Sequence, residues 1–223
     1  MKAVVVGATG LVGKELVRLL LNQKKYSKVI VIARRRLSIV HPRLEQQLIS
    51  FDELNVCPAE WFEGADVFCT LGTTMKQAKS KEKFKLVDYH YVVELGKLVK
   101  KHHANKLLVV TAMGSSESSL FFYSKVKGMT ERVLQELQLP QLIIVRPSLI
   151  IGNRHEFRFG ESLAARLSSW LSFAFKGKMK KYKPNEAKDI ALAMMKLALL
   201  CKEPLRIVSS SEIASWAKQR IYK

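Results

Sequence analysis

The chain has 223 residues, with 38 lysines and arginines against 19 aspartates and glutamates, which gives a formal net charge of +19. Hydrophobic residues make up 48% of it, so the sequence can bury a core and is not a disordered basic tail. The basic residues are spread along the chain without any RNA- or DNA-binding motif, so we expect no dedicated nucleic-acid binding. No apolar run reaches the ~18 residues that a transmembrane helix needs, so we expect no membrane-spanning segment.

The three cysteines, Cys57, Cys69 and Cys201, are far apart and form no CxxC pair. This pattern offers neither a cysteine-only zinc site nor a disulfide scaffold, and it is typical of a reducing compartment. We therefore expect a cytoplasmic protein without a metal site.

Strand-like and helix-like apolar segments alternate along the first two thirds of the chain. Short β-branched runs predict strands, and runs with helical periodicity predict helices between them. The strands are expected at 3–6, 29–33, 44–49, 66–71, 107–111 and 142–145, and the helices at 11–23, 58–62, 84–103 and 121–138. Continuous apolar strands that alternate with helices indicate an α/β fold of the Rossmann type, a doubly wound parallel sheet covered on both faces.

The pattern changes after Arg146-Pro147. A polar loop is expected at 151–160, then an amphipathic, aromatic-rich segment at 162–175, a basic stretch at 176–183 and a helix at 186–200. We expect one NAD(P)-binding domain over residues 1–223, in which residues 150–185 form a small C-terminal substrate lobe. For the amphipathic segment, three roles stay open: a lid or packing surface, self-association into a homo-oligomer, or contact with a membrane surface.

A glycine-rich turn follows the first predicted strand. Gly7 lets the chain turn tightly, Gly10 lets a pyrophosphate approach the backbone N–H groups, and Gly13 lets the next helix pack on the sheet. The N-terminus of that helix then favours an anion through its dipole and free N–H groups. The motif predicts a dinucleotide site that uses Gly7, Thr9, Gly10, Leu11, Val12 and Gly13.

The second predicted strand ends in three arginines, Arg34, Arg35 and Arg36. NAD-specific folds place an acidic residue here to bind the ribose 2′-hydroxyl, and this sequence has none. Guanidinium groups suit a 2′-phosphate instead, and they can stack on adenine. Arg34 and Arg35 therefore favour NADP(H) over NAD(H), although a solvated basic turn would have the same sequence.

Tyr123 and Lys127 form a Tyr-x-x-x-Lys motif on the helix predicted at 121–138. The spacing places both side chains on one helix face, where the ammonium is expected to lower the pKa of the phenol, ordinarily about 10. A hydroxyl just beyond the fifth strand would polarise a substrate carbonyl. Thr111, 12 residues before Tyr123, is the best candidate, and Ser115 and Ser116 are alternatives. Together these residues predict general acid–base catalysis, with Lys127 also within reach of a ribose hydroxyl.

In these residues the sequence resembles the atypical branch of the short-chain dehydrogenase/reductase superfamily, in particular the Tat-interacting-protein-like oxidoreductases. The glycine spacing carries the resemblance, together with the segments 66–74, 87–89, 123–128 and 145–147. In that family the segment after the fourth strand borders the cofactor, which adds Leu71, Gly72 and Thr73 to the expected cofactor site. The sequence departs from the family at Thr111, where serine is common, and at Ser50, where relatives tend to have aspartate.

The resemblance implies an NADPH-binding oxidoreductase that reduces the carbonyl of a small-molecule substrate by hydride transfer. Thr111, Tyr123 and Lys127 would be its catalytic residues. Members of this branch can also bind the cofactor without turnover, so the alternative is a non-catalytic, NADP(H)-sensing regulatory or binding protein. A third hypothesis, a nucleoside-diphosphate-sugar epimerase, is disfavoured because the chain is short for such an enzyme.

Overall fold

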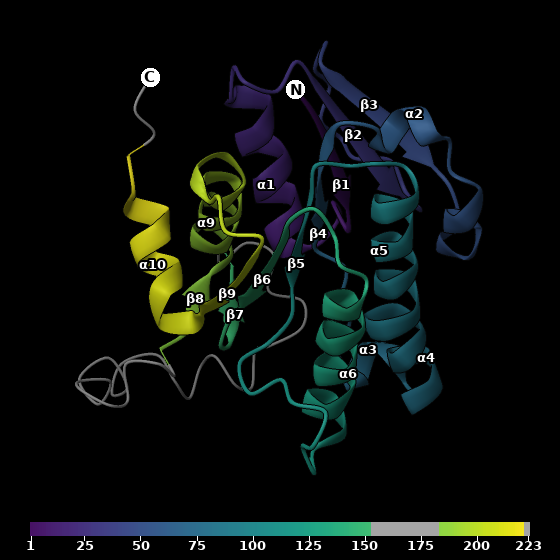
Figure 1. Ribbon diagram of the computed structural model, residues 1–223, viewed down its shortest axis with the longest axis vertical. Coiled ribbons are helices and arrows are strands. Elements are labelled where there is room, and N and C mark those ends of the chain that lie inside the picture. The colour runs from purple at the N-terminus through teal and green to yellow at the C-terminus, as the bar shows by residue number, and fades with distance from the viewer. Residues whose placement is uncertain (153–182, 221–223) are drawn as a thin grey trace.

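Seven strands form one fully parallel sheet in the computed structural model, which describes residues 1–152 and 183–220. They are β1 (Lys2–Val6), β2 (Lys28–Ala33), β3 (Leu44–Leu48), β4 (Ala65–Cys69), β5 (Lys106–Val110), β6 (Leu142–Arg146) and β9 (Leu205–Ser209). Their order in the sheet is β3-β2-β1-β4-β5-β6-β9 (Figure 1). The chain therefore winds outward from β1 to β3 and then restarts beside β1 with β4. This confirms the predicted doubly wound, Rossmann-type fold, whose topological switch point lies between β1 and β4.

The register of the central strands aligns their carboxyl ends at one edge of the sheet. Val6 at the end of β1 pairs with Ile32 of β2 on one side and with Cys69 of β4 on the other. On β4, Cys69 also pairs with Val109 of β5. The turns that follow these strands therefore meet at the same edge.

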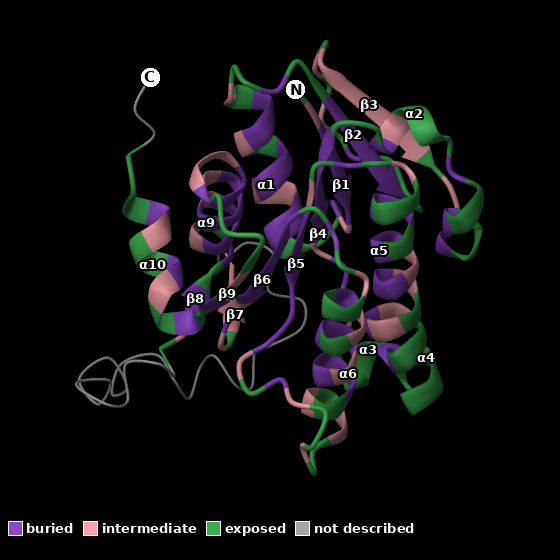
Figure 2. Ribbon diagram, viewed as in Figure 1, coloured by how far each residue is buried: buried purple, intermediate pink, exposed green. Residues whose placement is uncertain are grey.

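Helices cover both faces of the sheet (Figure 1). One face packs against α1 (Leu11–Asn22), α9 (Ala187–Leu200) and α10 (Ser210–Lys218), and the other against α2 (Ala59–Phe62), α5 (Tyr91–Lys101) and α6 (Phe122–Glu136). Successive strand residues contribute to opposite cores, as Val5 does to the first and Val4 to the second. The strands are consequently buried on both sides (Figure 2), which explains their continuous apolar sequences.

The helix predicted at 84–103 is divided by a π-helical turn. The structure contains α3 (Met75–Ala78) and α4 (Lys81–Lys85), then the π-helical turn η2 (Leu86–His90), and then α5. A π turn adds one residue to a helical turn, and an apolar pattern that runs through it does not reveal the insertion. Asp88 lies within this turn and is completely buried.

Several elements were not predicted. They are α3, β9, α10, the 3₁₀ helix η1 (Phe51–Val56), and a second, two-stranded sheet of β7 (Ile150–Ile151) and β8 (Asn185–Glu186). The amphipathic segment predicted at 162–175 lies outside the described residues, as do most of the loop at 151–160, of the basic stretch at 176–183 and of the expected substrate lobe. Within residues 1–152 and 183–220, no helix combines the length and apolarity needed to cross a membrane.

Candidate functional site

The turn between β1 and α1 has the conformation that its glycines predict. Gly7 has φ +90°, and a Cβ there would lie 2.5 Å from the carbonyl carbon of Thr70, so only glycine fits against the end of β4. A Cβ on Gly13 would lie 2.3 Å from the carbonyl oxygen of Gly7. Gly10 differs, because it is exposed and its Cβ would meet only the Gly7 oxygen, at 3.4 Å. The space that a side chain on Gly10 would fill is therefore open to a ligand.

The amino end of α1 is suited to a phosphate. Among the described residues, α1 has no side-chain cap and no acidic residue in its first turn. The first backbone bond of the helix runs from Lys14 N–H to the Gly10 carbonyl oxygen at 3.0 Å. The N–H groups of Leu11, Val12 and Gly13 precede that bond, so they point along the helix axis toward the exposed turn. Together with the open space at Gly10, this arrangement fits the diphosphate of a dinucleotide.

A second turn, after β4, lies directly beside the glycine turn. Thr70 binds the Val6 carbonyl oxygen with its N–H at 2.8 Å and with its hydroxyl at 3.2 Å, which fixes the chain as it leaves β4. Beyond it, Leu71 is buried and Gly72 is exposed. A Cβ on Gly72 would lie 3.7 Å from Lys127 Nζ. The exposed backbone of Gly72 therefore covers the buried ammonium of Lys127.

Lys127 and Asp88 form a buried ion pair below Gly72. Lys127 Nζ lies 2.7 Å from Asp88 Oδ1, and the two side chains are 5% and 0% exposed. The other carboxylate oxygen, Asp88 Oδ2, accepts a hydrogen bond from the Thr73 N–H at 2.9 Å. About one helical turn after Lys127, the Thr130 hydroxyl donates to the backbone carbonyl oxygen of Asp88 at 2.8 Å. The turn after β4 and helix α6 thus both hold Asp88 in place.

Tyr123 lies on α6 one turn before Lys127, and its ring packs 5.4 Å from that of Phe84. Although 38% of Tyr123 is exposed, partial burial raises the pKa of its phenol; Lys127 lowers that pKa and Asp88 raises it again. The predicted lowering of the Tyr123 pKa is therefore wrong, because burial and Asp88 outweigh Lys127. For Lys127 itself, burial lowers the pKa, but Asp88, Tyr123 and Cys69 together raise it above its ordinary value.

The three candidate hydroxyls each have another partner. Thr111 is buried after β5 and donates to Glu131 Oε1 at 2.6 Å. Ser115 donates to the carbonyl oxygen of Ala112 at 2.7 Å, and the Ser116 hydroxyl lies 2.8 Å from that of Ser118. The structure thus brings Tyr123 and Lys127 together, whereas it directs each of the hydroxyls predicted to assist them toward another group.

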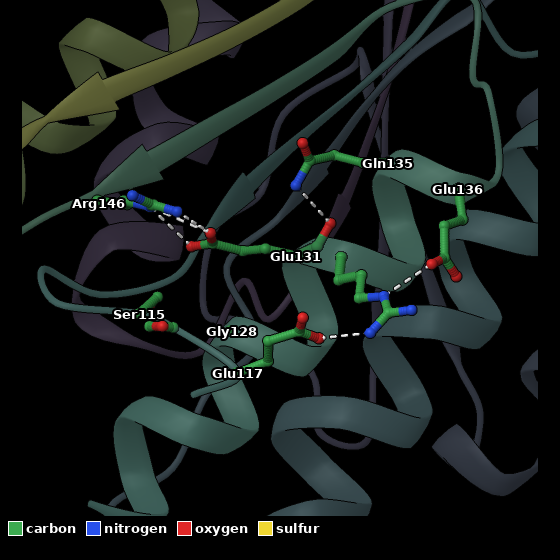
Figure 3. Close-up of a pocket in the computed structure, with 9 residues that line it drawn as sticks. Ser115, Glu117, Gly128, Glu131, Gln135, Glu136 and Arg146 are labelled. Atoms are coloured by element: carbon green, nitrogen blue, oxygen red, sulfur yellow. Dashed lines mark hydrogen bonds and ion pairs between the residues drawn. The ribbon is translucent and has the colours of Figure 1, made fainter. Parts of the chain in front are cut away.

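Glu131, the partner of Thr111, also forms an ion pair with Arg146 at the end of β6. The Arg146 Nε lies 3.0 Å and 3.1 Å from the two carboxylate oxygens, and Nη2 binds one of them as well. Figure 3 shows this pair in a pocket beside α6. In the same pocket, Arg132 binds Glu117 and Glu136, both at 2.8 Å. These charges satisfy one another, so we do not assign the substrate to this pocket.

The two arginines expected at the 2′-phosphate are exposed at the end of β2. The guanidinium of Arg34 lies over the ring of Phe51, 5.4 Å from its centroid. Phe51 begins η1, which Ser50 caps by accepting a hydrogen bond from the Asp52 N–H at 3.3 Å. Ser50, where the sequence departs from the family it resembles, therefore has a local structural role. Arg34 and Arg35 remain on the side of β1 opposite the Lys127–Asp88 pair, as an extended dinucleotide requires.

Asp88 and Glu131 were not predicted to belong to this region. Asp88 contributed to the family resemblance, but no pattern assigned it a role. The spacing of Lys127 and Glu131 would suggest a pair on one helix face, yet Lys127 binds Asp88 and Glu131 binds Arg146. A usable signal for Asp88 was a carboxylate four residues before Val92 and seven before Leu95, which is the spacing of an apolar helix face.

Comparisons with known proteins agree with the fold and with an NAD-binding domain in its first part. Residues 62–201 match the HIM1 family model, and residues 2–84 match the model of the semialdehyde dehydrogenase NAD-binding domain. Protein HTATIP2 of Rattus norvegicus is 35% identical over 178 residues, which cover 75% of this chain and 72% of that protein. Mitochondrial protein FMP52 of Eremothecium gossypii is 31% identical over 225 residues, 98% of each chain.

Similar solved structures share the fold at low identity. MoeE5 in complex with UDP-glucose and NAD has a TM-score of 0.68 at 15% identity, over 97% of this chain and 81% of that one. The UDP-Glc/GlcNAc 4-epimerase of Campylobacter jejuni has a TM-score of 0.68 at 13% identity, over 96% and 82% of the two chains. At such identities the likeness shows the fold and not the substrate.

The predicted cytoplasmic location is contradicted by the relatives. The FMP52 proteins of Eremothecium gossypii, Lodderomyces elongisporus and Scheffersomyces stipitis are all named mitochondrial. The prediction rested on three unpaired cysteines, which are indeed free and buried. Unpaired cysteines distinguish a reducing from an oxidising environment, but they do not distinguish one intracellular compartment from another.

The family assignment rests on two independent matches. The HIM1 model covers more than half of the chain, and the HTATIP2 relative is 35% identical over three quarters of it. The match at residues 2–84 adds an NAD-binding domain over the glycine turn. The chain therefore belongs to the HIM1 family, the Tat-interacting-protein-like branch of NAD(P)-binding proteins.

Proposed function

We propose that this protein is an NADP(H)-dependent oxidoreductase that reduces the carbonyl group of a small molecule. The observation that carries the proposal is the buried Lys127 behind the exposed Gly72, in the turn beside the glycine turn, with Tyr123 one helical turn earlier on α6. A phenol and an ammonium thus lie at the carboxyl edge of the sheet, where Rossmann folds bind a dinucleotide.

The chain offers groups for each part of NADPH. The N–H groups of Leu11, Val12 and Gly13 would hold the diphosphate. Arg34 and Arg35, which are exposed and directly follow the end of β2, would hold the 2′-phosphate. Lys127 would hold a ribose hydroxyl, with Leu71 and Thr73 beside it. NAD is present in the complexes of structural neighbours, and the arginines are the reason for proposing the phosphorylated form here.

The residues around Tyr123 suit proton donation. When bound, NADPH supplies a hydride to the carbonyl carbon. The phenol of Tyr123 donates its proton to the carbonyl oxygen, and its raised pKa keeps that proton in place at neutral pH. Lys127, held as an ammonium by Asp88, stabilises the phenolate that forms. Because Tyr123 is 38% exposed, solvent can return the proton.

Binding without turnover is the second candidate function. The observation that favours it is the hydrogen bond from Thr111 to Glu131, which occupies the hydroxyl expected to polarise the carbonyl. Ser115 and Ser116 are likewise bonded elsewhere. A protein of this kind would sense NADP(H) and pass the signal to a partner.

Transfer of deuterium separates the two candidates. The purified protein is incubated with NADPH that carries deuterium at its transferable position and with a panel of aromatic and aliphatic aldehydes and ketones. We expect deuterium on the carbon that bears the new hydroxyl of a product alcohol, in amounts that depend on the protein. NADPH that binds but transfers no label to any of these carbonyls would contradict the oxidoreductase and favour the sensor. Because the FMP52 relatives are named mitochondrial, carbonyl compounds extracted from mitochondria belong in the panel.

A further inference from the structure

The π-helical turn η2 places a carboxylate beneath the proposed active site. The Tyr91 N–H donates to the carbonyl oxygen of Leu86, which closes the wide turn between α4 and α5. Such turns within helices are frequent at functional sites. Asp88 lies in this turn and is 0% exposed, although neither the glycine motif nor the Tyr-x-x-x-Lys motif includes it. This buried position suggests that Asp88 acts on the residues of the site.

Asp88 is held from three directions. Lys127 on α6 lies 2.7 Å from Oδ1, the backbone of Thr73 donates to Oδ2 at 2.9 Å, and the Thr130 hydroxyl donates to the Asp88 carbonyl oxygen at 2.8 Å. These bonds connect η2 to α6 and to the turn after β4. The carboxylate cannot move without breaking its bonds to Lys127 and Thr73, so the position of Lys127 Nζ is fixed as well.

The titratable groups that face Lys127 come from three elements. They are Asp88 of η2, Tyr123 of α6 and Cys69 at the end of β4. Burial lowers the pKa of Lys127, and Asp88 is the largest of the groups that together raise it above its ordinary value. The same carboxylate raises the pKa of Tyr123 while Lys127 lowers it, so the two charges oppose each other at the phenol.

We propose that Asp88 is a positioning residue that fixes Lys127 Nζ behind Gly72 and offsets its charge, so that Tyr123 stands as a neutral phenol ready to donate a proton. Its role in reduction rests on the proposed function, whereas the ionic coupling of the three side chains does not. Without Asp88, either the buried Lys127 ammonium would lose its proton to solvent, or its uncompensated charge would stabilise the Tyr123 phenolate and the phenol would lose its proton to solvent. In both cases the pair would enter the reaction with one proton fewer.

Nuclear magnetic resonance of the full-length protein tests this coupling without cofactor or substrate. Tyrosine Cζ and lysine Cε carry carbon-13, and the signals of Tyr123 and Lys127 are assigned with Tyr123→Phe and Lys127→Gln. In Asp88→Asn, we expect the first deprotonation of the Tyr123–Lys127 pair at a pH lower by about one unit than in the wild type. The direction is the same whichever group loses the proton, because the negative charge that opposed the loss is gone.

Asp66→Asn is the matched control. Asp66 is also 0% exposed and lies on β4, but its carboxylate accepts from the Tyr26 hydroxyl at 2.8 Å, at the opposite end of that strand. We expect this variant to leave the titration of the Tyr123–Lys127 pair unchanged. A shift equal to that of Asp88→Asn would show that any buried carboxylate has this effect and would overturn the specific role of Asp88.

The double variant Asp88→Asn/Lys127→Met covers the case in which Asp88→Asn does not fold, because it leaves no unpaired buried charge. The two opposing charges disappear together, so Tyr123 is expected to titrate close to its wild-type pH. A rise of about one pH unit in the double variant would mean that Lys127 acted on Tyr123 uncompensated, and it would overturn the proposal. The proposal would also be overturned if Asp88→Asn folded and its Tyr123–Lys127 pair titrated as in the wild type. A shifted titration without deuterium transfer would instead leave the coupling intact and refute only the oxidoreductase.

Discussion

Replacing Tyr123 by phenylalanine is expected to lower kcat for carbonyl reduction by about a hundredfold to ten-thousandfold, the usual contribution of a general acid. The substitution removes only the hydroxyl. The ring that packs 5.4 Å from Phe84 stays, so the fold and the affinity for NADPH should change little. The measurement combines steady-state rates, for any carbonyl that accepts label from NADPH, with the dissociation constant of the nucleotide.

Tyr89→Phe provides the control for this experiment. Tyr89 is partly buried against the same small cluster of Phe84 and Val126, but we assign its hydroxyl no role in the reaction. Its variant should keep kcat within about twofold of the wild type, a difference of only ~0.4 kcal/mol in the barrier. Equal turnover by wild type and Tyr123→Phe would show that Tyr123 is not the acid.

The second large effect is on stability. Asp88→Asn is expected to reduce the free energy of unfolding by about 3–5 kcal/mol, because it leaves the ammonium of Lys127 buried without a counter-charge. Asparagine has nearly the shape of aspartate, so packing should be preserved and the loss should come from the charge. Urea unfolding followed by circular dichroism measures the difference, and the slope of the transition shows whether the folded state is equally compact.

The unfolding experiment is best done at neutral pH, because the pKa of Lys127 is raised in the folded protein. Asp88 raises the pKa of Lys127 in the folded protein, so the stabilisation is fully present below the ordinary lysine pKa. It is lost only as the pH rises through the pKa of the folded state. At neutral pH, the Lys127–Asp88 pair therefore makes its full contribution to the free energy of unfolding of the wild type, and the variant lacks that contribution.

Two variants separate charge burial from other losses. Asp88→Asn/Lys127→Met removes both charges and should recover most of the lost stability, since it leaves no uncompensated charge buried. Arg132→Ala breaks two exposed ion pairs, with Glu117 and Glu136, and should cost less than about 1 kcal/mol. If Asp88→Asn unfolded at the same urea midpoint as the wild type, an unpaired buried Lys127 would not destabilise the fold, and the prediction would be contradicted.

The central strands could be predicted from the sequence because their burial on both faces leaves continuous apolar runs. The edge strand β9 could not, since its Leu205 and Ile207 are 43% and 36% exposed and its pattern is mixed. The π turn at Asp88 was missed for a different reason. Helical periodicity records which side of a helix is apolar, but it does not record an extra residue in one turn.

The conformation of the glycine turn and the shared helix face of Tyr123 and Lys127 could be predicted because both depend on local spacing. The glycines must meet backbone atoms only a few residues away or on the next strand, and Tyr123 and Lys127 lie on one helix face. The ion pairs could not be predicted in this way. Sequence spacing favours Lys127 with Glu131, whereas the packing of η2 and β6 against α6 gives each of them a distant partner, Asp88 and Arg146.

Titration of the purified full-length chain with NADPH and NADH, followed by nucleotide fluorescence, tests most directly whether this edge of the sheet holds NADP(H). We expect NADPH to bind about tenfold to a hundredfold more tightly than NADH, as one or two charge-assisted bonds to the 2′-phosphate imply. In the variant Arg34→Ala/Arg35→Ala, that preference should disappear while NADH affinity stays nearly constant. Equal losses for the two nucleotides would reject the role of the arginines, and failure of the wild type to bind either nucleotide would contradict the proposed cofactor site itself.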